Sequence, residues 1–279
     1  MRLGGPVLQP CSTPEEWLDY VRRMGYRAVT FPADHQSPQA VIDRYAELCR
    51  ENGLYIAEVG AWSNPLDVDP AARRAARELC KKQLELADYV RAGCCVNIAG
   101  GHGTVWDGPH PDSFSQETFE EVVYAVREII DAVHPTRTKY SLEMMPYMIP
   151  DSSVSFLKLL KAVDRPGFGV HVDIVNIINS PYRYYANKDI IDETFDLLGD
   201  SIISCHAKDI WLENQLTVHL SERVPGDGFL DYRAYIDRIS RLGGDTALLL
   251  EHLHSQEDLE RGLAFVRGTA KGMGMGIEL

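Results

Sequence analysis

Apolar segments alternate with amphipathic ones eight times along this chain, and this alternation constrains the fold more than any other feature of the sequence. The apolar segments are near-continuous runs of aliphatic and aromatic residues, which is typical of strands buried on both faces of a parallel sheet. The predicted strands are residues 2–8, 26–32, 55–62, 89–100, 139–146, 168–176, 202–210 and 246–253.

The amphipathic segments carry the start and stop signals of helices. The first of them opens with Ser12 or Thr13 as its N-cap and ends at Gly25. The predicted helices are residues 12–25, 37–53, 69–88, 115–134, 152–164, 187–200, 231–244 and 255–272. Strands that are each followed by a helix predict a single (β/α)8 TIM barrel domain over residues 1–279.

An open doubly wound sheet is the alternative fold with the same alternation of elements. Such a sheet usually carries a Gly-x-Gly-x-x-Gly turn after its first strand, and this sequence has no such turn. We therefore favour the barrel. In a barrel, functional residues gather at the carboxyl ends of the strands, so the strand ends are the places to search.

Composition and charge exclude several classes of partner. The net charge is −13 and 45% of the residues are hydrophobic, which suits a globular protein that repels nucleic acid and anionic membranes. The first residues, "MRLGGPVLQP", form no signal peptide, and no segment approaches the ~18 apolar residues of a membrane span. The six cysteines show no zinc-type spacing and are expected to be reduced. We predict a cytoplasmic protein without nucleic-acid or membrane partners.

An ionisable residue closes each of four consecutive predicted strands. These residues are Glu143 in "SLEMMP", Asp173 in "GVHVDIVN", His206 in "SCHAKDI" and Glu251 in "ALLLEHL". Neighbouring strands lie ~4.8 Å apart, so inward side chains at one level can meet at one point. Carboxylates that meet in a half-buried site repel one another unless a cation neutralises them. Carboxylates with one imidazole suit a divalent ion, and we predict a site for Mn²⁺, Co²⁺, Mg²⁺ or Zn²⁺.

These four segments resemble the metal-binding strands of the sugar phosphate isomerase/epimerase family, the xylose-isomerase-like TIM barrels. The resemblance implies that one divalent ion, most often Mn²⁺, is bound by Glu143, Asp173, His206 and Glu251. It also implies that Glu143 and Glu251 exchange protons with a bound sugar from opposite sides. The segment "ERVPGDGFLDY" resembles the loop after the metal histidine in this family, which implies a substrate contact for Arg223.

The resemblance implies a sugar isomerase or epimerase that moves a proton next to the carbonyl of a keto-sugar through a metal-stabilised enediolate. One position departs from the family: many epimerases have a histidine where this chain has Asn176, which can bind a sugar hydroxyl but cannot exchange protons. A 3-keto-glycoside lyase or hydratase, such as a subunit of a C-glycoside deglycosidase, is therefore the alternative. A non-catalytic sugar-binding or scaffold barrel is the third possibility.

Other residues near the predicted strand ends are candidates for substrate contact. Lys208 shares strand parity with His206, so it should face inward and either touch substrate or pair with a ligand carboxylate. His102 in "AGGHGT" and Trp62 at the end of the third strand lie on the same rim, where they contact sugar or only pack. His171 should lie deeper, as a partner of the metal ligands or, as we expect, a packed core histidine.

A nuclease is the competing activity within this barrel family, because the family includes apurinic-site endonucleases. That chemistry needs several metal ions and a positive surface for phosphates. The candidate ligands here suffice for one ion, and the net charge of −13 opposes phosphate binding. We therefore expect a small sugar or glycoside as substrate. As a separate expectation, the protein forms a homo-oligomer or a hetero-oligomer with a small partner subunit.

Overall fold

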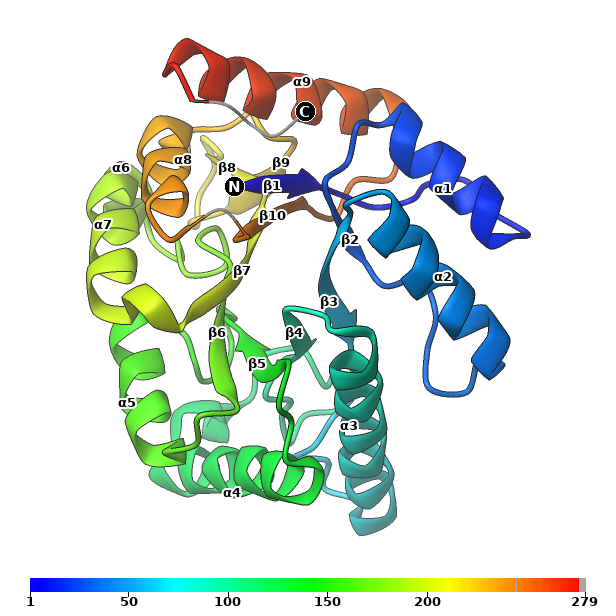
Figure 1. Ribbon diagram of the computed structural model, residues 1–279. Coiled ribbons are helices and arrows are strands. Elements are labelled where there is room, and N and C mark those ends of the chain that lie inside the picture. The colour runs from blue at the N-terminus through cyan, green and yellow to red at the C-terminus, as the bar shows by residue number, and fades with distance from the viewer. Residues whose placement is uncertain (244, 276–279) are drawn as a thin grey trace.

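Parallel strands form a nearly closed barrel with helices around its outside, as Figure 1 shows. The computed structural model describes residues 1–243 and 245–275. The strands of the barrel are β1 (Arg2–Gly4), β2 (Ala28–Thr30), β3 (Tyr55–Gly60), β4 (Cys94–Asn97), β5 (Lys139–Glu143), β6 (Phe168–Val172), β7 (Ile202–Ala207) and β10 (Ala247–Leu250). Their order in the sheet is β1-β10-β7-β6-β5-β4-β3-β2, so strands that follow one another along the chain lie side by side. This order confirms the predicted (β/α)8 barrel.

The helices between the strands follow the predicted segments closely. They are α1 (Pro14–Arg23), α2 (Gln39–Glu51), α3 (Pro70–Val90), α4 (Gln116–Val133), α5 (Ser153–Val163), α7 (Asn187–Leu198), α8 (Tyr232–Ser240) and α9 (Gln256–Gly272). Side-chain caps fix many of the starts; for example, the Ser115 hydroxyl accepts the N–H of Thr118 at the start of α4. Gly244, which ends one predicted helix, and residues 276–279 of the predicted domain lie outside the described residues.

The strands are shorter than the apolar patterns predicted. The predicted strand over residues 89–100 is reduced to β4 because α3 continues to Val90 and the chain turns at Arg91, whose φ is 60°. The first strand likewise ends at Gly4. Apolar residues beyond a strand end can still be buried under the neighbouring helices, so an apolar run marks burial better than it marks a strand boundary.

The connection after β7 was predicted as a loop, and this prediction was wrong. It contains an antiparallel hairpin of β8 (Asp209–Leu212) and β9 (Leu220–Arg223). The connection after β6 contains the short helix α6 (Pro181–Tyr185), and short 3-10 helices cover Pro111–Phe114 (η1) and Gly199–Ser201 (η2). The hairpin lies at the carboxyl end of the barrel strands, where it borders the candidate site described below.

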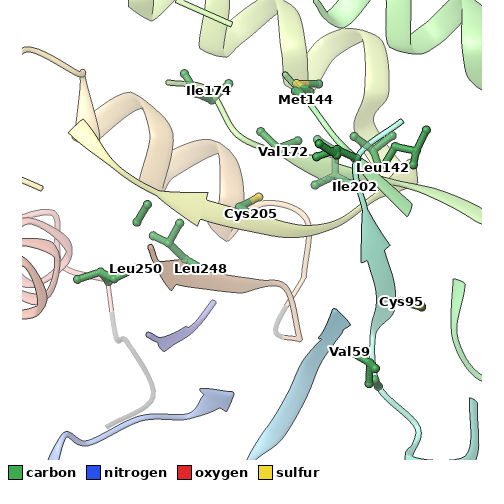
Figure 2. Close-up of a cluster of buried hydrophobic side chains, with 14 of the residues drawn as sticks. Val59, Cys95, Leu142, Met144, Val172, Ile174, Ile202, Cys205, Leu248 and Leu250 are labelled. Carbon is green, nitrogen blue, oxygen red and sulfur yellow. The ribbon is translucent and has the colours of Figure 1, made fainter. Parts of the chain in front are cut away.

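Strand alternation divides the core into an outer and an inner part. Figure 2 labels buried apolar side chains of the barrel strands, among them Val59, Leu142, Val172, Cys205 and Leu250. These side chains belong to the same apolar cluster as residues of the surrounding helices. Each of the five stands directly beside a polar residue of the barrel interior, so the contact with the helices fixes which way the polar neighbour points.

Toward the amino ends of its strands, the interior of the barrel is filled by apolar side chains, most of them small. Ala28, Ala57, Ala247 and Leu249 form a separate apolar cluster. On β10, Ala247 and Leu249 share parity with Glu251, so the apolar layer lies beneath the carboxylate. A floor of apolar side chains keeps water away from the inner side of the polar residues above it.

The barrel closes where β1 meets β2, without a regular ladder between these strands in the described part of the chain. The Arg27 N–H donates to the Leu3 carbonyl oxygen at 2.8 Å. A Cβ at Gly4 would meet the Ala28 carbonyl oxygen, so only glycine allows this close approach. Among the described residues, no helix is both long and apolar enough to cross a membrane.

Candidate metal centre

Side chains from four strands converge at the carboxyl end of the barrel. Glu143 ends β5, Asp173 follows β6, His206 lies in β7, and Glu251 follows β10. Each offers a ligand atom, and these atoms lie within 4.8 Å of one another. Glu143, Asp173 and His206 are 4%, 1% and 3% exposed, and the Glu251 side chain is 23% exposed. We call these residues the acid–histidine cluster.

His206 stands at the centre of the acid–histidine cluster. Its Nδ1 lies 3.0 Å from Glu251 Oε2, 3.2 Å from Glu143 Oε1 and 3.8 Å from Asp173 Oδ2. The neighbouring Cys205 faces the opposite way and is buried in the apolar layer under the helices. Alternation along β7 therefore brings the imidazole, and not the thiol, to the carboxylates.

Lys208 is buried among the same carboxylates, with 1% of its surface exposed. Its Nζ lies 2.6 Å from Glu251 Oε2, 2.9 Å from Asp173 Oδ2 and 3.8 Å from Glu143 Oε1. One ammonium stands against three carboxylates, so the site is rich in negative charge and suits a divalent cation.

The close charges shift the pKa of each group. Burial raises the pKa of Asp173 and of Glu251, but the positive charges of Lys208 and His206 outweigh it and hold both pKa values below their usual range. Burial raises the pKa of Glu143, and the charge of Glu251 adds to this although His206 opposes it. Burial lowers the pKa of His206 and of Lys208, but the carboxylates raise both above their usual values. A cation that enters this site competes with the Lys208 ammonium and with a proton on His206.

The donor set fits a divalent ion. Asp173 Oδ2 and Glu251 Oε2 are buried, and neither receives a hydrogen bond of good geometry from any described residue. The Lys208 ammonium contacts both oxygens, at 2.9 and 2.6 Å, so they already attract a cation and a divalent ion would take the same place. Three carboxylates with one imidazole and no thiolate suit Mg²⁺, Mn²⁺, Co²⁺ or Zn²⁺ better than they suit a structural zinc site.

Asn176 supports the cluster from the loop after β6. Its backbone N–H donates to Asp173 Oδ1 at 3.1 Å. Its side-chain amide donates to Glu143 Oε1 at 3.1 Å and to the Met144 carbonyl oxygen at 3.0 Å. The backbone N–H therefore orients Asp173 and the side-chain amide orients Glu143, while the substrate contact of Asn176 stays a prediction.

The β8–β9 hairpin borders the cluster and is tied down by Asp209. The Asp209 carboxylate accepts the N–H groups of Ile210, Gly226 and Leu230 at 2.9 Å each. Burial raises the pKa of Asp209, and these backbone hydrogen bonds oppose the rise. Asp209 therefore fixes the loop that returns from the hairpin.

On the hairpin, neighbouring residues of β9 face different surroundings. The Arg223 guanidinium pairs with Glu213 at 2.5 Å on the same hairpin, and its side chain is 40% exposed. Glu222 Oε1 lies 4.0 Å from Lys208 Nζ. The structure brings Glu222 close to the acid–histidine cluster, and the substrate contact of Arg223 stays a prediction.

His252 lies beside Glu251 at the mouth of the site. Its φ of 55° is unusual for a residue other than glycine. Its Nδ1 lies 2.9 and 3.0 Å from the two carboxylate oxygens of Glu222, and its Nε2 lies 3.6 Å from Glu251 Oε1. The hydrogen bond with Glu222 raises the pKa of His252 although burial opposes this. His252 was not predicted, because regular alternation after the inward-facing Glu251 would point it away from the barrel interior.

Two further predicted contacts lie on loops at the same end of the barrel. Trp62, just after β3, is 45% exposed, and its indole fills the space beside Gly60. His102, after β4, places its Nε2 2.8 Å from Glu121 Oε2, with the His110 ring 6.0 Å away. Neither side chain joins the acid–histidine cluster. Both reach solvent, so a role in substrate contact stays a prediction.

Glu58 is the buried acid that the sequence analysis missed. It lies within β3, is 4% exposed, and places Oε2 3.0 Å from His171 Nε2 and Oε1 3.5 Å from His206 Nε2. Burial raises its pKa, but hydrogen bonds from the two imidazoles outweigh this and hold the pKa well below its usual range. His171 is fully buried, as expected for a core histidine, and it is hydrogen-bonded.

A separate cleft of about 870 Å³ opens on the outside of the barrel between α2 and α3. Its lining includes Arg44, Tyr89 and Arg137, whose polar groups are paired with acidic side chains of the same region. The residues that line it come from α2, from the end of α3, from the amino end of β3 and from the adjoining connections, which include Arg137. The cleft is therefore distinct from the acid–histidine cluster.

The fold and the cluster together define a class: (β/α)8 barrels whose carboxylates and histidine meet at the carboxyl end of the strands. Residues 18–269 match the sequence model of the xylose isomerase-like TIM barrel. Because this match covers most of the chain, the chain belongs to the xylose isomerase-like TIM barrel family, which confirms the resemblance found in the sequence. Among curated proteins, none matches this chain in sequence.

Solved structures similar to this chain include three with informative descriptions. A D-tagatose 3-epimerase-like protein is 17% identical, with a TM-score of 0.73 over 98% of each chain. A probable 3-DHS dehydratase of petrobactin synthesis from Bacillus anthracis is 18% identical, with a TM-score of 0.71 over 93% of each chain. A xylose isomerase-like TIM barrel protein from Mycobacterium smegmatis in complex with magnesium is 16% identical, with a TM-score of 0.66 over 92% of this chain and 90% of the other. At these identities the similarity establishes the fold.

Proposed function

We propose that this protein is a divalent-metal-dependent sugar isomerase or epimerase that moves a proton next to the carbonyl of a keto-sugar. The observation that carries the proposal is the convergence of three carboxylates and one imidazole within 4.8 Å at the carboxyl end of the barrel. The family supports it, and so does the similarity in fold to a D-tagatose 3-epimerase-like protein.

In this proposal the acid–histidine cluster holds one divalent ion, for which Mn²⁺ is our first choice. A magnesium complex of a protein with the same fold supports a divalent ion at such a barrel. When bound, the ion would supply positive charge to stabilise negative charge that develops on the carbonyl oxygen of the sugar. Lys208 Nζ, 2.6 Å from Glu251 Oε2, would add a second positive charge to the same site.

Glu143 and Glu251 are the proposed acid and base. They come from β5 and β10, which are separated in the sheet by β6 and β7, so the two carboxylates approach a common point from different sides. That placement suits a substrate held between them, with one carboxylate removing a proton and the other returning one. Glu251 is the more exposed of the pair and the nearer to solvent.

Metal content and proton exchange test this proposal together. The protein, purified without a histidine tag, should contain about one Mn, Co, Mg or Zn ion per chain by mass spectrometry, and the ion should be lost in His206→Ala. In ²H₂O, unphosphorylated ketohexoses should gain deuterium next to the carbonyl, as seen by NMR. A matched control is Thr194→Val, which removes a buried hydroxyl of α7 that bonds to Ser153. A chain that binds no divalent ion even when ions are supplied would refute the proposal.

A keto-glycoside lyase or dehydratase is the second candidate. His252, whose side chain is 54% exposed beside Glu251, is an acid that could protonate a leaving group at the mouth of the site. The similarity in fold to a probable dehydratase supports this candidate. Release of an aglycone or of water from a 3-keto substrate, without exchange into a recovered epimer, would favour it over epimerisation.

A further inference from the structure

We propose that Glu58 is a positioning residue of the metal centre: it accepts the Nε2–H of His206 and so turns the Nδ1 lone pair of this imidazole toward the carboxylates. The inference rests on the metal site of the proposed function and adds to it a residue from β3. In the closed barrel β3 lies across from β7, so the imidazole is held from the side opposite its own strand.

The two nitrogens of His206 face different partners. Nδ1 faces Glu251 and Glu143, whereas Glu58 Oε1 is the polar partner of Nε2 among the described residues. An ionised carboxylate only accepts hydrogen bonds, so the proton between Glu58 and His206 must belong to the imidazole. At 3.5 Å the contact is longer than a standard hydrogen bond, but the negative charge still favours a proton on the nitrogen that faces it. By the same reasoning Nδ1 carries a proton when no ion is bound, because Glu251 and Glu143 face it at 3.0 and 3.2 Å. An entering ion displaces this proton and binds Nδ1, whereas the proton on Nε2 stays with Glu58.

A local irregularity of β3 turns Glu58 into the barrel. Val29 of β2 pairs with Ile56, and the next residue, Thr30, pairs with Glu58, so Ala57 is an extra residue in β3. A bulge of this kind changes which face a side chain points to. Both Ala57 and Glu58 consequently lie on the inner side, where Ala57 joins the apolar floor and Glu58 reaches the histidines.

His171 and Thr30 hold the Glu58 carboxylate in place. His171 Nε2 lies 3.0 Å from Oε2, and the Thr30 hydroxyl donates to Oε1 at 3.0 Å. The His171 ring lies edge-on to the His206 ring, with centroids 4.1 Å apart. Each carboxylate oxygen therefore has a donor, and the acid cannot turn away from His206 without losing one of them.

The same three side chains could instead be ligands of a second ion, since Glu58, His171 and His206 also bring ligand atoms within 4.8 Å of one another. Two features oppose this. Both Glu58 oxygens already receive hydrogen bonds, whereas the buried oxygens Asp173 Oδ2 and Glu251 Oε2 receive none of good geometry from the described residues. An ion at Nε2 would also have to share His206 with the first ion. The number of ions per chain separates the two interpretations.

The test measures how tightly Mn²⁺ binds to the metal-depleted protein and to Glu58→Gln. An amide at this position offers a donor as well as an acceptor, so it no longer requires the proton on Nε2. Loss of a partner that orients a metal-binding histidine weakens metal affinity about 10- to 100-fold, and we expect a loss in this range with one ion per chain retained. The absorption bands of the Co²⁺-loaded protein should also change, because they report the orientation of the imidazole.

Thr194→Val is the matched control, because it removes a buried hydrogen bond far from the site; it should leave Mn²⁺ affinity and the Co²⁺ bands unchanged. If Glu58→Gln does not fold, Thr30→Val, which removes only the donor to Oε1, should show a smaller loss of affinity in the same direction. Equal affinities in Glu58→Gln and wild type would overturn this inference and leave the proposed function standing. Two ions in the wild type and one in the variant would make Glu58 a ligand, and a wild type without any bound ion would overturn both.

Discussion

The two halves of the barrel differ sharply in what their strands place inside. In the described residues of β1–β4, Glu58 is the one buried charged side chain, and small apolar residues such as Ala28 and Ala57 fill the interior. The strands β5–β7 and β10 place the acid–histidine cluster inside, and Lys208 follows β7.

This difference in interior side chains indicates that the two halves of the sheet have different roles. The acid–histidine cluster is carried by consecutive strands of the sheet, which bring their side chains to one point. The other half closes the barrel, excludes water from below and supplies one carboxylate from across the interior. Substitutions in the two halves should consequently affect different measurements.

The largest effect is expected for Glu251→Gln in the second half. Removing a proposed acid or base should lower the rate of deuterium exchange into a ketohexose about 10²- to 10⁴-fold at saturating metal. NMR in ²H₂O gives the rate, and Glu128→Gln, on the outside of α4, serves as the control with an unchanged rate. Exchange at the wild-type rate in Glu251→Gln would show that the chemistry does not depend on this half of the barrel as proposed.

Lys208→Met should destabilise the metal-free protein strongly. The carboxylates around Lys208 would be left without their buried counter-charge, and breaking a buried ion pair in this way lowers the free energy of unfolding by about 3–5 kcal/mol. A divalent ion should restore part of the loss, because it binds the folded state. Chemical denaturation measures both effects. The exposed Lys188→Met is the control, with a change of about 0.5 kcal/mol or less; an equal loss in both variants would contradict the prediction.

Asn97→Ala tests the first half of the barrel. The Asn97 side chain is fully buried and bridges β4 to Ser63, with its amide 3.2 Å from the Ser63 carbonyl oxygen. Leaving such groups without partners should lower the free energy of unfolding by about 1–3 kcal/mol. Mn²⁺ affinity, measured by calorimetry, should stay at the wild-type value. A marked loss of affinity would break the division between the halves.

The smallest effect is expected at Asp88, which joins the halves at the amino end of the strands. Its carboxylate accepts the N–H groups of Thr136 and Arg137 at 2.7 and 2.6 Å and pairs with the Arg137 guanidinium. Burial raises the pKa of Asp88, but these donors outweigh it and lower the pKa below its usual value. Asp88→Asn should lower the free energy of unfolding by about 1 kcal/mol at pH 7, because the site is near the surface.

The sign of the pH dependence follows from the lowered pKa of Asp88. A carboxyl group with a depressed pKa in the folded state stabilises the protein above its unfolded pKa of about 3.9, and this stabilisation is lost as pH falls through the folded pKa. Denaturation curves of wild type and Asp88→Asn should therefore differ at neutral pH and converge in acid. A difference that persists unchanged into acid would show that the hydrogen bonds, and not the charge, are responsible.

The fold could be predicted from the sequence because the patterns that mark its strands and helices are local and repeated. Apolar runs and helix caps recur in phase, so errors at single boundaries, such as the end of α3 at Val90, do not change the topology. The β8–β9 hairpin escaped prediction because each of its strands has only four residues and β9 is mostly polar. Such a hairpin depends on contacts such as those of Asp209, which are distant in sequence.

The acid–histidine cluster could be predicted from the sequence because its residues lie at strand ends, where a polar residue is unexpected within an apolar run. Glu58 could not be predicted, because it lies within a strand and strict alternation after the inward-facing Ala57 would point its side chain outward. The extra residue that reverses its direction has no signature in the sequence of β3 alone, since it depends on pairing with β2. His252 escaped for a related reason: its direction depends on a backbone conformation that a pattern of residue types does not reveal.

The meeting of β1 and β2, with its Arg27 to Leu3 hydrogen bond and no regular ladder among the described residues, also bears on how the molecule fluctuates. Amide protons near this seam should exchange with solvent through local opening at a lower free energy than those of β5–β7. Around the barrel the seam lies opposite β5 and β6. Opening there leaves the strands of the acid–histidine cluster paired, so the protein can admit solvent on one side while the carboxylates and the imidazole stay together on the other.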